Sequence, residues 1–386
     1  MKMEKIKYNG HKLFNNLEID FKDSNENILS TIVIIGENGT GKTTLLKNIY
    51  DAFDIDERGY KEVGEGNVEL TPDSYTVTVK LNKNEYGVLH PDGYSFDVND
   101  GASFHKVVYM PTEINFEKVN KVDNTLNFKP DFQNVIDQNM TQNIPSFIAT
   151  KINKEIFKNR NKTIGEVIDK VCNEINSVFS VMDLDIKLVG LSETSETKPI
   201  FRNSLGKEFD ITGLSSGEKQ LFLRALSLKF LEVNNSVILI DEPEISLHPQ
   251  WQRKIIDVYE RIGKNNQLII ATHSPHIIGN IESKQLRVMK KDQEGIKLVE
   301  NNELNETYGK NIGDILSTTM RLDSLRNEDI TIKLNRVYEL LNKNLYDTKE
   351  FKETFNYLRR YLGDLDKDIM RIRVDISVRN KKNAKG

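Results

Sequence analysis

The chain has 386 residues, a formal net charge of −4 and a pI of about 6.0, with 38% hydrophobic and 29% charged residues. These values predict a soluble globular protein of one large domain or two, and they exclude a global basic field that would attract nucleic acid. Cys172 is the only cysteine, which excludes an internal disulfide, and the lack of a signal-peptide core or a run of about 18 apolar residues predicts a cytoplasmic protein with no membrane segment.

The first third of the chain contains several predicted strands. Residues 4–8 and 13–21 predict two strands around Asn9-Gly10, a sequence typical of hairpin turns. Residues 32–35 are all apolar and predict a buried strand, and the apolar spacing of residues 45–53 predicts a helix. Further strands, the last of them ended by Pro111, are predicted at residues 75–81, 94–98 and 106–110.

Helical spacing begins at residue 131 and continues to residue 180, after which residues 184–211 return to strands. The next segment predicts helix, strand, helix and strand in turn, at residues 217–231, 237–240, 250–262 and 268–271. This alternation predicts an α/β fold with a mostly parallel core sheet. At the end of the chain, one apolar helix face ending at Gly363 is formed by Phe351, Phe355, Leu358 and Leu362.

These changes of pattern predict four parts of the chain. Two of them form the core: an N-terminal part with antiparallel strands at residues 1–130, and a C-terminal part at residues 184–300. A helical insertion at residues 131–183 separates them, and a helical extension at residues 301–386 follows.

A glycine-rich segment follows the strand at residues 32–35. It contains the nine residues predicted to bind a nucleotide: Gly36, Glu37, Asn38, Gly39, Thr40, Gly41, Lys42, Thr43 and Thr44. A glycine-rich turn between a strand and a helix presents backbone N–H groups and the positive helix end to phosphate. We expect Lys42 to contact the β- and γ-phosphates and Thr43 to bind Mg²⁺. The alternative is a glycine-rich turn that binds no ligand.

The predicted strand at residues 237–240 ends in two carboxylates, Asp241 and Glu242. By itself, this pattern is equally typical of a buried strand that closes in an acidic turn. After a phosphate-binding loop, it indicates the Mg²⁺ side of a nucleotide site. We therefore expect Asp241 to hold the metal through water and Glu242 to activate the attacking water as a general base.

Two more segments carry candidate site residues. Residues 214–220 open a helix, where Ser215 and Glu218 are spaced as a capping box. The functional alternative is that this helix N-terminus binds a γ-phosphate, with Ser215, Ser216, Gly217 and Glu218 as nucleotide-binding residues. Their place directly before the acidic strand favours the functional alternative. His273 follows the strand at residues 268–271; a lone histidine there is usually structural, but in this context it can sense the γ-phosphate.

These motifs, in this order, resemble those of the ATP-binding-cassette (ABC) superfamily: Walker A at residues 36–43, the signature motif at 214–220, Walker B at 237–242 and the switch histidine at 273. The forms DEPEISLHPQW and ATHSPH are most similar to the non-transporter branch that includes RecF and the overcoming-lysogenization-defect proteins (AAA_21). Stand-alone members include the Septu and retron-associated ATPases of bacterial anti-phage operons. The resemblance implies a P-loop NTPase of the ABC-ATPase type that binds ATP and Mg²⁺, with Lys42, Glu242 and His273 as catalytic residues.

The resemblance also implies partners. In this family one site needs two chains, because Walker A of one subunit holds the nucleotide while Ser215 and Gly217 of the other contact its γ-phosphate. This implies a homodimer or a higher oligomer joined by ATP. The sequence shows no second set of catalytic residues, so we expect a nucleotide-gated clamp that controls a separate effector, such as a nuclease, in anti-phage defence or DNA repair.

One family feature is missing, namely the glutamine that usually follows the strand after Walker A. Here the predicted strand ends in Pro111-Thr112-Glu113, so Thr112 or Glu113 is the candidate replacement. Two alternatives stay open: the ATP-binding subunit of a membrane transporter, and a scaffold that senses ATP without hydrolysing it. The intact Glu242 argues against the scaffold, and the long separation of Lys42 from Ser215 argues against the transporter.

Basic residues concentrate in two places. A solvated helix face and a frayed tail would explain them, and the alternative is a docking surface for the DNA backbone or an acidic partner. The two groups are Lys151, Lys154, Lys158, Arg160 and Lys162, and then Arg371, Arg373, Arg379, Lys381, Lys382 and Lys385.

Overall fold

The chain divides into two compact units, Met1–Ile315 and Leu316–Gly386. The computed structural model describes residues 1–53, 61–62, 67–70, 75–82, 105–112, 114, 130–193, 197–293, 295–299, 304–322 and 324–383. The predicted strand at residues 94–98 and the candidate residue Glu113 lie outside this described part. The second unit begins at Leu316, whereas the sequence predicted the C-terminal extension from residue 301.

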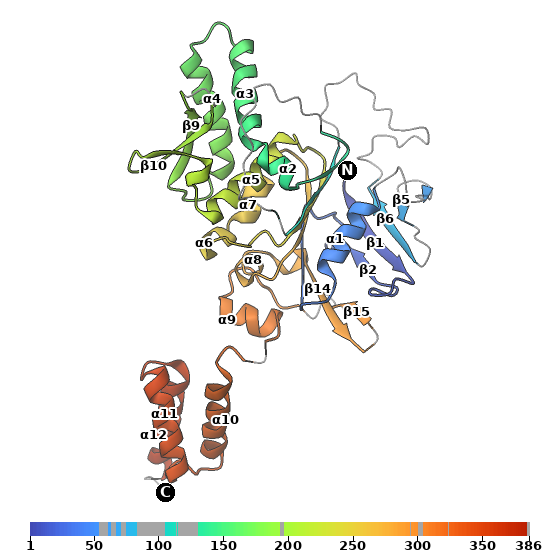
Figure 1. Cartoon of the computed structure of the whole chain (residues 1–386). Coiled ribbons are helices and arrows are strands. Elements are labelled where there is room, and N and C mark those ends of the chain that lie inside the picture. The colour runs from blue at the N-terminus through green and yellow to red at the C-terminus, as the bar shows by residue number, and fades with distance from the viewer. Residues whose placement is uncertain are drawn as a thin grey trace. The chain divides into compact units, whose positions relative to one another are not determined.

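The largest sheet in the described ranges has seven strands and forms the centre of the first unit (Figure 1). In spatial order they are β15 (Gly295–Leu298), β14 (Leu286–Asp292), β3 (Thr31–Gly36), β13 (Gln267–Ala271), β12 (Val237–Asp241), β7 (Val107–Met110) and β8 (Gln133–Val135). Only β15 pairs antiparallel; the other six run parallel. The predicted α/β fold with a mostly parallel core sheet is therefore confirmed.

The three strands that carry the predicted motifs lie next to one another. β13 pairs with β3 on one side and with β12 on the other, and Ala271 lies opposite both Ile34 and Asp241. Because the strands are parallel, their carboxyl ends meet at one edge of the sheet. This is the edge at which ligands bind in open α/β sheets. The topology thus brings three segments distant in sequence to one place.

A second, antiparallel sheet is built from β1 (Met3–Asn9), β2 (Glu18–Asp20), β4 (Lys61–Glu62), β5 (Asn67–Leu70) and β6 (Thr76–Leu81), in the spatial order β2-β1-β6-β5-β4. The strand predicted at residues 13–21 is shorter than expected, because His11 Nδ1 accepts the N–H groups of Leu13 and Phe14 and holds them in a turn. Helix α1 (Lys42–Asp51) lies between the two sheets (Figure 1). Its buried face, including Leu45 and Ile49, packs into the same core as residues of β1 and β3.

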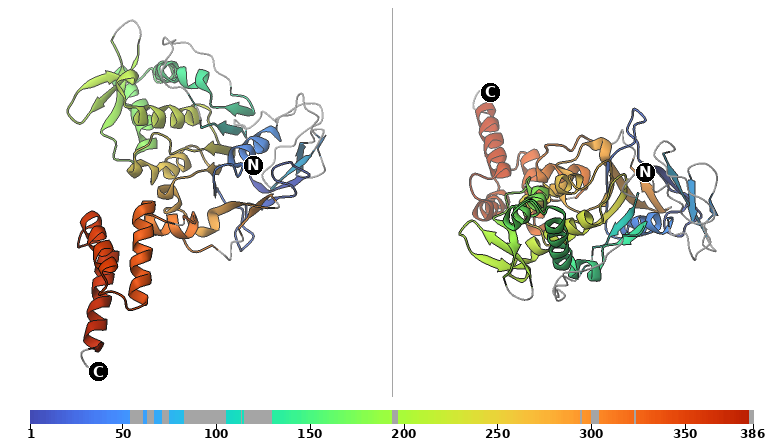
Figure 2. Two further views of the ribbon diagram at one scale, coloured as in Figure 1. Left: turned by 60° about the horizontal axis from the view of Figure 1, so that its bottom comes forward. Right: turned by 90° about the horizontal axis from the view of Figure 1, so that it is seen from above.

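The predicted insertion starts with a strand rather than a helix, because β8 extends the central sheet beside β7. Its helices are α2 (Gln138–Gln142), α3 (Ile144–Lys158) and α4 (Ile164–Asn176). A small antiparallel sheet of β9 (Ile186–Leu191), β10 (Pro199–Asn203) and β11 (Glu208–Asp210) packs against α4 (Figures 1 and 2). Phe222 of helix α5 (Ser216–Phe230) contacts the rings of Phe179 and Phe201 and so joins this part to the core.

Short helices connect the last core strands. The helix predicted at residues 250–262 is divided into α6 (Pro249–Gln252) and α7 (Ile255–Glu260). After β13 come α8 (Pro275–Ile278) and, after β15, α9 (Ile312–Asp314) and a π-helix at Ile315–Thr319. Across the described residues, each helix is too short or too polar to span a lipid bilayer.

The second unit contains three α-helices in its described residues, α10 (Glu328–Asn342), α11 (Lys349–Leu362) and α12 (Lys367–Asn383). The predicted apolar face of α11 enters their common core, where Phe351 and Leu358 are buried. Gly363 ends α11 with φ of 83°, as expected of a glycine at a helix C-terminus. Arg326 fixes the start of α12, because its guanidinium pairs with Asp366 at 2.8 Å and with Asp368 at 2.7 Å.

Candidate nucleotide-binding site

The glycine-rich loop connects the end of β3 to the start of α1. Gly39 and Gly41 have φ values of 81° and 83°, a left-handed conformation that glycine adopts without strain. Gly41 is the N-cap of α1, and among the described residues no side-chain cap accepts a hydrogen bond from the first N–H groups of the helix. These N–H groups and the positive end of the helix therefore suit an anion.

Lys42 extends back over this loop. Its Nζ donates to the backbone carbonyls of Gly36 at 3.0 Å and Glu37 at 3.3 Å. Burial lowers the pKa of Lys42, while the carboxylates of Glu242 and Asp241 act in the opposite direction. The loop thus has a cation at its centre and backbone N–H groups around it, an arrangement that matches phosphate oxygens.

Thr43 and Asp241 meet across the site. The Thr43 hydroxyl donates to Asp241 Oδ2 at 2.7 Å, and the other carboxylate oxygen, Oδ1, is buried without a hydrogen-bond partner among the described residues. A hydroxyl and a carboxylate are oxygen ligands of the kind that Mg²⁺ prefers, and the unpartnered oxygen can accept a metal-bound water. The described residues hold no cluster of three or more His, Cys, Asp or Glu side chains suited to a metal. Mg²⁺ in ATPases needs only one or two carboxylates in addition to substrate phosphates, so these residues fit it.

Glu242 and His273 lie at the same edge. Their side chains are 28% and 31% exposed, and His273 Nε2 is 3.7 Å from Glu242 Oε1, so both groups are accessible to a ligand. Glu242 has a left-handed backbone with φ of 46°, which is uncommon for a residue other than glycine and occurs often at functional sites. Burial and the charge of Lys42 lower the pKa of His273, which keeps its imidazole neutral near pH 7.

Glu244 was missed by the sequence analysis. Its Oε1 accepts the Thr272 hydroxyl at 2.6 Å and the His273 backbone N–H at 2.8 Å. Burial raises the pKa of this carboxyl. Glu244 therefore fixes the loop that carries His273. The sequence did contain a signal, since a second glutamate follows Pro243, but its partners are about 30 residues away.

The segment 215–218 forms the capping box that one of the two interpretations predicted. Ser215 Oγ accepts the Glu218 N–H at 3.3 Å, and the Glu218 carboxylate accepts the Ser215 N–H at 2.8 Å. Ser215 and Ser216 are exposed, and no hydrogen bond or ion pair of the described residues joins residues 215–218 to residues 36–44. Gly217 is required for packing, because a Cβ there would lie 2.7 Å from the Ser246 carbonyl oxygen.

Arg224 on α5 is a second residue that the sequence analysis missed. Its side chain is only 1% exposed, and Nη2 donates to the carbonyls of Pro111 at 3.1 Å and Thr112 at 2.8 Å. Nε and Nη1 have no partner in the described part of the chain. Because β7 lies beside β12, this contact holds Thr112, a candidate replacement for the missing glutamine, at the site edge.

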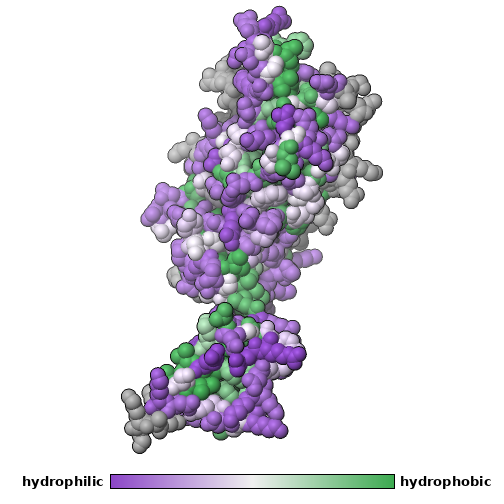
Figure 3. Space-filling model, turned by 90° about the vertical axis from the view of Figure 1, so that its left-hand side faces the viewer, coloured by the Kyte–Doolittle hydropathy of each residue, from purple (hydrophilic) through white to green (hydrophobic). Residues whose placement is uncertain are grey.

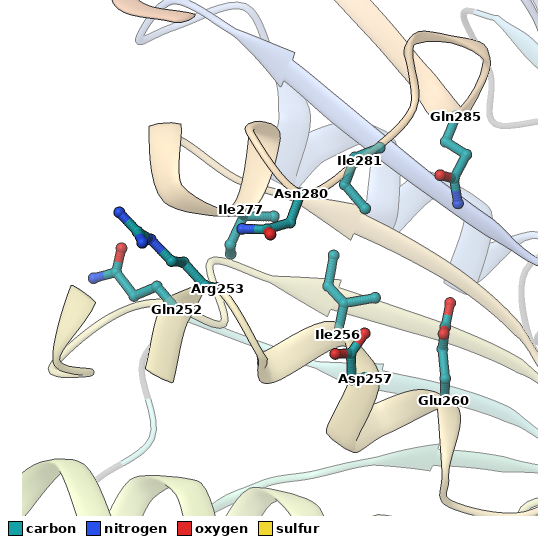
Figure 4. Close-up of a pocket in the computed structure, with 9 residues that line it drawn as sticks. All are labelled: Gln252, Arg253, Ile256, Asp257, Glu260, Ile277, Asn280, Ile281 and Gln285. Carbon is teal, nitrogen blue, oxygen red and sulfur yellow. The ribbon is translucent and has the colours of Figure 1, made fainter. Parts of the chain in front are cut away.

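Gln252 connects the loop after β12 to the loop after β13. Its amide donates to the Leu247 carbonyl at 2.9 Å and accepts the Ser274 hydroxyl at 2.6 Å. Beside it lies a cavity of about 120 Å³, away from the glycine-rich loop, with side chains facing one another across it (Figure 4). The cavity is lined by Gln252, Arg253, Ile256, Asp257, Glu260, Ile277, Asn280, Ile281 and Gln285.

The fold is an α/β fold with a mostly parallel core sheet, and the order and placement of its motifs resemble those of ABC-type ATPases. The glycine-rich loop follows β3, the acidic pair lies at the end of β12, and the histidine follows β13, the strand between them. Residues 113–279 match the AAA_21 family, described as "AAA domain, putative AbiEii toxin, Type IV TA system".

Comparison with known proteins confirms the resemblance to retron-associated and Septu ATPases. The chain is 28% identical over 232 residues to the Retron Vc95 probable ATPase of Vibrio cholerae serotype O1 biovar El Tor, covering 55% of this chain but only 44% of that relative. It is 23% identical over 359 residues to the Septu protein PtuA of Bacillus thuringiensis, covering 84% of this chain and 85% of the relative. Among solved structures, an SMC head bound to the C-winged helix domain of ScpA matches with a TM-score of 0.44 and 15% identity, over 78% of this chain and 97% of that one.

Proposed function

We propose that this chain binds ATP with Mg²⁺ and hydrolyses it to ADP and phosphate. The observation that carries the proposal is the Thr43–Asp241 hydrogen bond of 2.7 Å beside Lys42. It joins the two predicted metal ligands, which are 198 positions apart in the sequence, at the mouth of the glycine-rich loop. If this were a structural turn that binds no ligand, we would expect the buried Asp241 Oδ1 to have a hydrogen-bond partner.

Each residue at the edge of the sheet has a role in the proposed mechanism. Lys42 holds the β- and γ-phosphates, and Thr43 and Asp241 would hold Mg²⁺, which neutralises phosphate charge when bound. Glu242 accepts a proton from the attacking water as the bond between the γ-phosphorus and the bridging oxygen breaks. His273, neutral at pH 7, contacts the γ-phosphate by a hydrogen bond.

We further propose that two copies of the chain complete each site. Ser215, Ser216, Gly217 and Glu218 would contact the γ-phosphate on the opposite copy. Two facts support this: the serines are exposed, and within one chain the described residues show no hydrogen bond from this segment to the glycine-rich loop. The N-terminus of α5, a helix of 15 residues, would then face the anion.

In this proposal the ATP-joined dimer is a clamp that controls a separate effector protein, such as a nuclease, in anti-phage defence or DNA repair in the cytoplasm. DNA is a further proposed ligand, and a membrane partner is not part of the proposal. The names of the relatives, a retron ATPase and a Septu protein, support the defence context.

The proposed metal ligand Thr43 provides a direct test. Thr43→Val keeps the side-chain shape but removes the hydroxyl, and Thr43→Ser is the matched control that keeps it. We expect Mg²⁺ to strengthen binding of a fluorescent ATP analogue by the wild type and by Thr43→Ser, but not by Thr43→Val. Equal Mg²⁺ dependence in all three proteins would contradict the assignment.

A further inference from the structure

The outward face of helix α12 carries an uncovered apolar stripe. Met370, Val374 and Val378 are 44%, 63% and 46% exposed, and their spacing of four residues places them in one row along the helix. The opposite face is the packed one, where Ile369 and Ile372 are buried in the core of the second unit. A row of exposed apolar side chains on a helix is typical of a binding surface.

Positive charges lie at both ends of this row. Lys367 and Lys381 are exposed, each seven positions from Val374, and neither forms an ion pair with a carboxylate of the described residues. Arg371 borders the stripe and lies over the Tyr338 ring at 5.9 Å. Figure 3 shows apolar residues at the surface of this unit among hydrophilic ones.

The acidic side chains of α12 do not compensate these charges. Asp368 pairs with Arg326 at 2.7 Å, and Asp375 pairs with Arg379 at 2.9 Å, so both are engaged on other sides of the helix. The stripe, with Met370, Val374 and Val378 between Lys367 and Lys381, is therefore apolar in the middle and positive at its ends. A partner that fits it has apolar side chains flanked by carboxylates.

A second copy of α12 does not fit this description. If two such helices paired in antiparallel fashion about Val374, Lys367 of each would face Lys381 of the other, and parallel pairing would place each lysine against itself. Both arrangements bring like charges together. Nucleic acid does not explain the apolar row either, because phosphates contact cations and not aliphatic side chains.

We propose that this face of α12 docks an acidic amphipathic helix of the effector protein. The inference rests on the proposed control of a separate effector. It adds which surface of this chain binds the effector and which kinds of side chain the effector would use. The apolar row would enter the partner's apolar face, as in other complexes of a helix with a groove or a second helix. Lys367 and Lys381 would pair with carboxylates at its rim and fix the register.

Two charge-introducing variants separate the docking role from stability. Val374→Glu places a carboxylate in the middle of the stripe, and because Val374 is already 63% exposed, the fold has little to lose. Asn356→Glu, at an exposed position of α11, is the matched control. Loss of the apolar contact at Val374 should weaken partner binding about tenfold or more. Lys381→Glu should also weaken binding, and more so at low salt.

The test uses the full chain and the separately purified protein encoded by the neighbouring gene, with affinity measured by fluorescence anisotropy. Binding lost in Val374→Glu and kept in Asn356→Glu supports the proposal. Equal binding by both variants overturns the docking surface but leaves the effector and the ATPase proposals intact. If even the wild type does not bind, the effector proposal fails and the surface proposal fails with it, whereas ATP turnover is tested independently.

A photo-crosslinker at position 374, in the same mixture, identifies the occupant. The expected product is a crosslink to a segment of the neighbouring protein that carries Asp or Glu beside apolar residues. A crosslink to a second copy of this chain, to added lipid vesicles or to DNA, or no crosslink, overturns the proposal.

Discussion

Replacing Glu242 by glutamine tests the proposed chemistry most specifically. The amide keeps the size of the side chain and its capacity to lie near His273, where Oε1 is now 3.7 Å from Nε2, but it cannot accept a proton from water. General-base catalysis contributes about 10²- to 10⁴-fold, so turnover should fall by that factor. This corresponds to about 3–5 kcal/mol of lost transition-state stabilisation. Lys42, Thr43 and Asp241 are unchanged, so ATP affinity should stay near that of the wild type.

Three measurements define the outcome: phosphate release, ATP affinity and mass by light scattering with ATP and Mg²⁺. Glu242→Gln should bind ATP, turn over slowly and accumulate as a dimer. Glu282→Gln is the matched control, because Glu282 pairs with Lys284 at the surface, and it should behave like the wild type. Wild-type turnover by Glu242→Gln would refute the reasoning and show that another residue is the base.

Three further predictions concern the residues around this centre. Ser215→Arg should block turnover while leaving ATP binding nearly intact, because the proposed dimer places Ser215 at the nucleotide of the opposite chain; loss of the cap costs about 1 kcal/mol of stability. Loss of ATP binding as severe as in Lys42→Ala would contradict this. Arg224→Met should lower the free energy of unfolding by about 1.5–3 kcal/mol and reduce turnover more than ATP affinity, because it removes the donor to the Pro111 and Thr112 carbonyls. Arg224→Lys should retain part of the stability and of the turnover, and unchanged turnover in Arg224→Met would contradict a role of Arg224 in holding these carbonyls. Burial raises the pKa of Glu244 above its ordinary 4.5, so the folded protein loses stability as the pH rises from 4.5 through the raised pKa and this carboxyl ionises. Glu244→Gln does not ionise, so its melting temperature relative to the wild type should be higher at pH 8 than at pH 4; a constant difference would contradict the assignment.

The parts of the fold that follow local patterns could be predicted from the sequence. The buried strand at residues 32–35, the glycine-rich loop and the apolar face of α11 were predictable, because each depends on spacing and on glycine conformation within a few residues. The hairpin was less so: the strand expected at residues 13–21 is only Glu18–Asp20, because His11 captures the N–H groups of Leu13 and Phe14. Such local competition for backbone donors is not visible in hydrophobic periodicity.

Contacts between distant segments were harder to predict. From the sequence alone, Arg224 would be expected to lie on the solvent side of its helix. In the structure it is buried and donates to the carbonyls of Pro111 and Thr112, more than 110 residues earlier. The sequence analysis assigned the residues of β8 to the helical insertion. Their extended form depends on pairing with β7, which local sequence patterns do not show. Glu244 and Gln252 likewise gain their roles only when the loops after β12 and β13 come together. Contacts between distant segments determine the structure and role of these residues, and the pattern of a single sequence gives little information about such contacts.

Some of the basic residues near the C-terminus form ion pairs in the structure. Arg379 pairs with Asp375 at 2.9 Å, and Arg373 lies 3.5 Å from Asp364, so these two cations are used within the second unit. Lys381 stays exposed at the end of the apolar stripe. A count of charges along the sequence does not reveal these ion pairs, and the helix presents a mixed surface of paired and unpaired cations.

Phosphate release from ATP by the purified chain, compared between the wild type and Lys42→Ala, tests the central claim most directly. Lys42 is the cation at the centre of the glycine-rich loop, with Nζ 3.0 Å from the Gly36 carbonyl, and alanine removes its charge. The account predicts Mg²⁺-dependent turnover by the wild type and loss of both ATP binding and turnover in the variant. Turnover and affinity unchanged in Lys42→Ala would show that the glycine-rich loop is not the site of ATP hydrolysis.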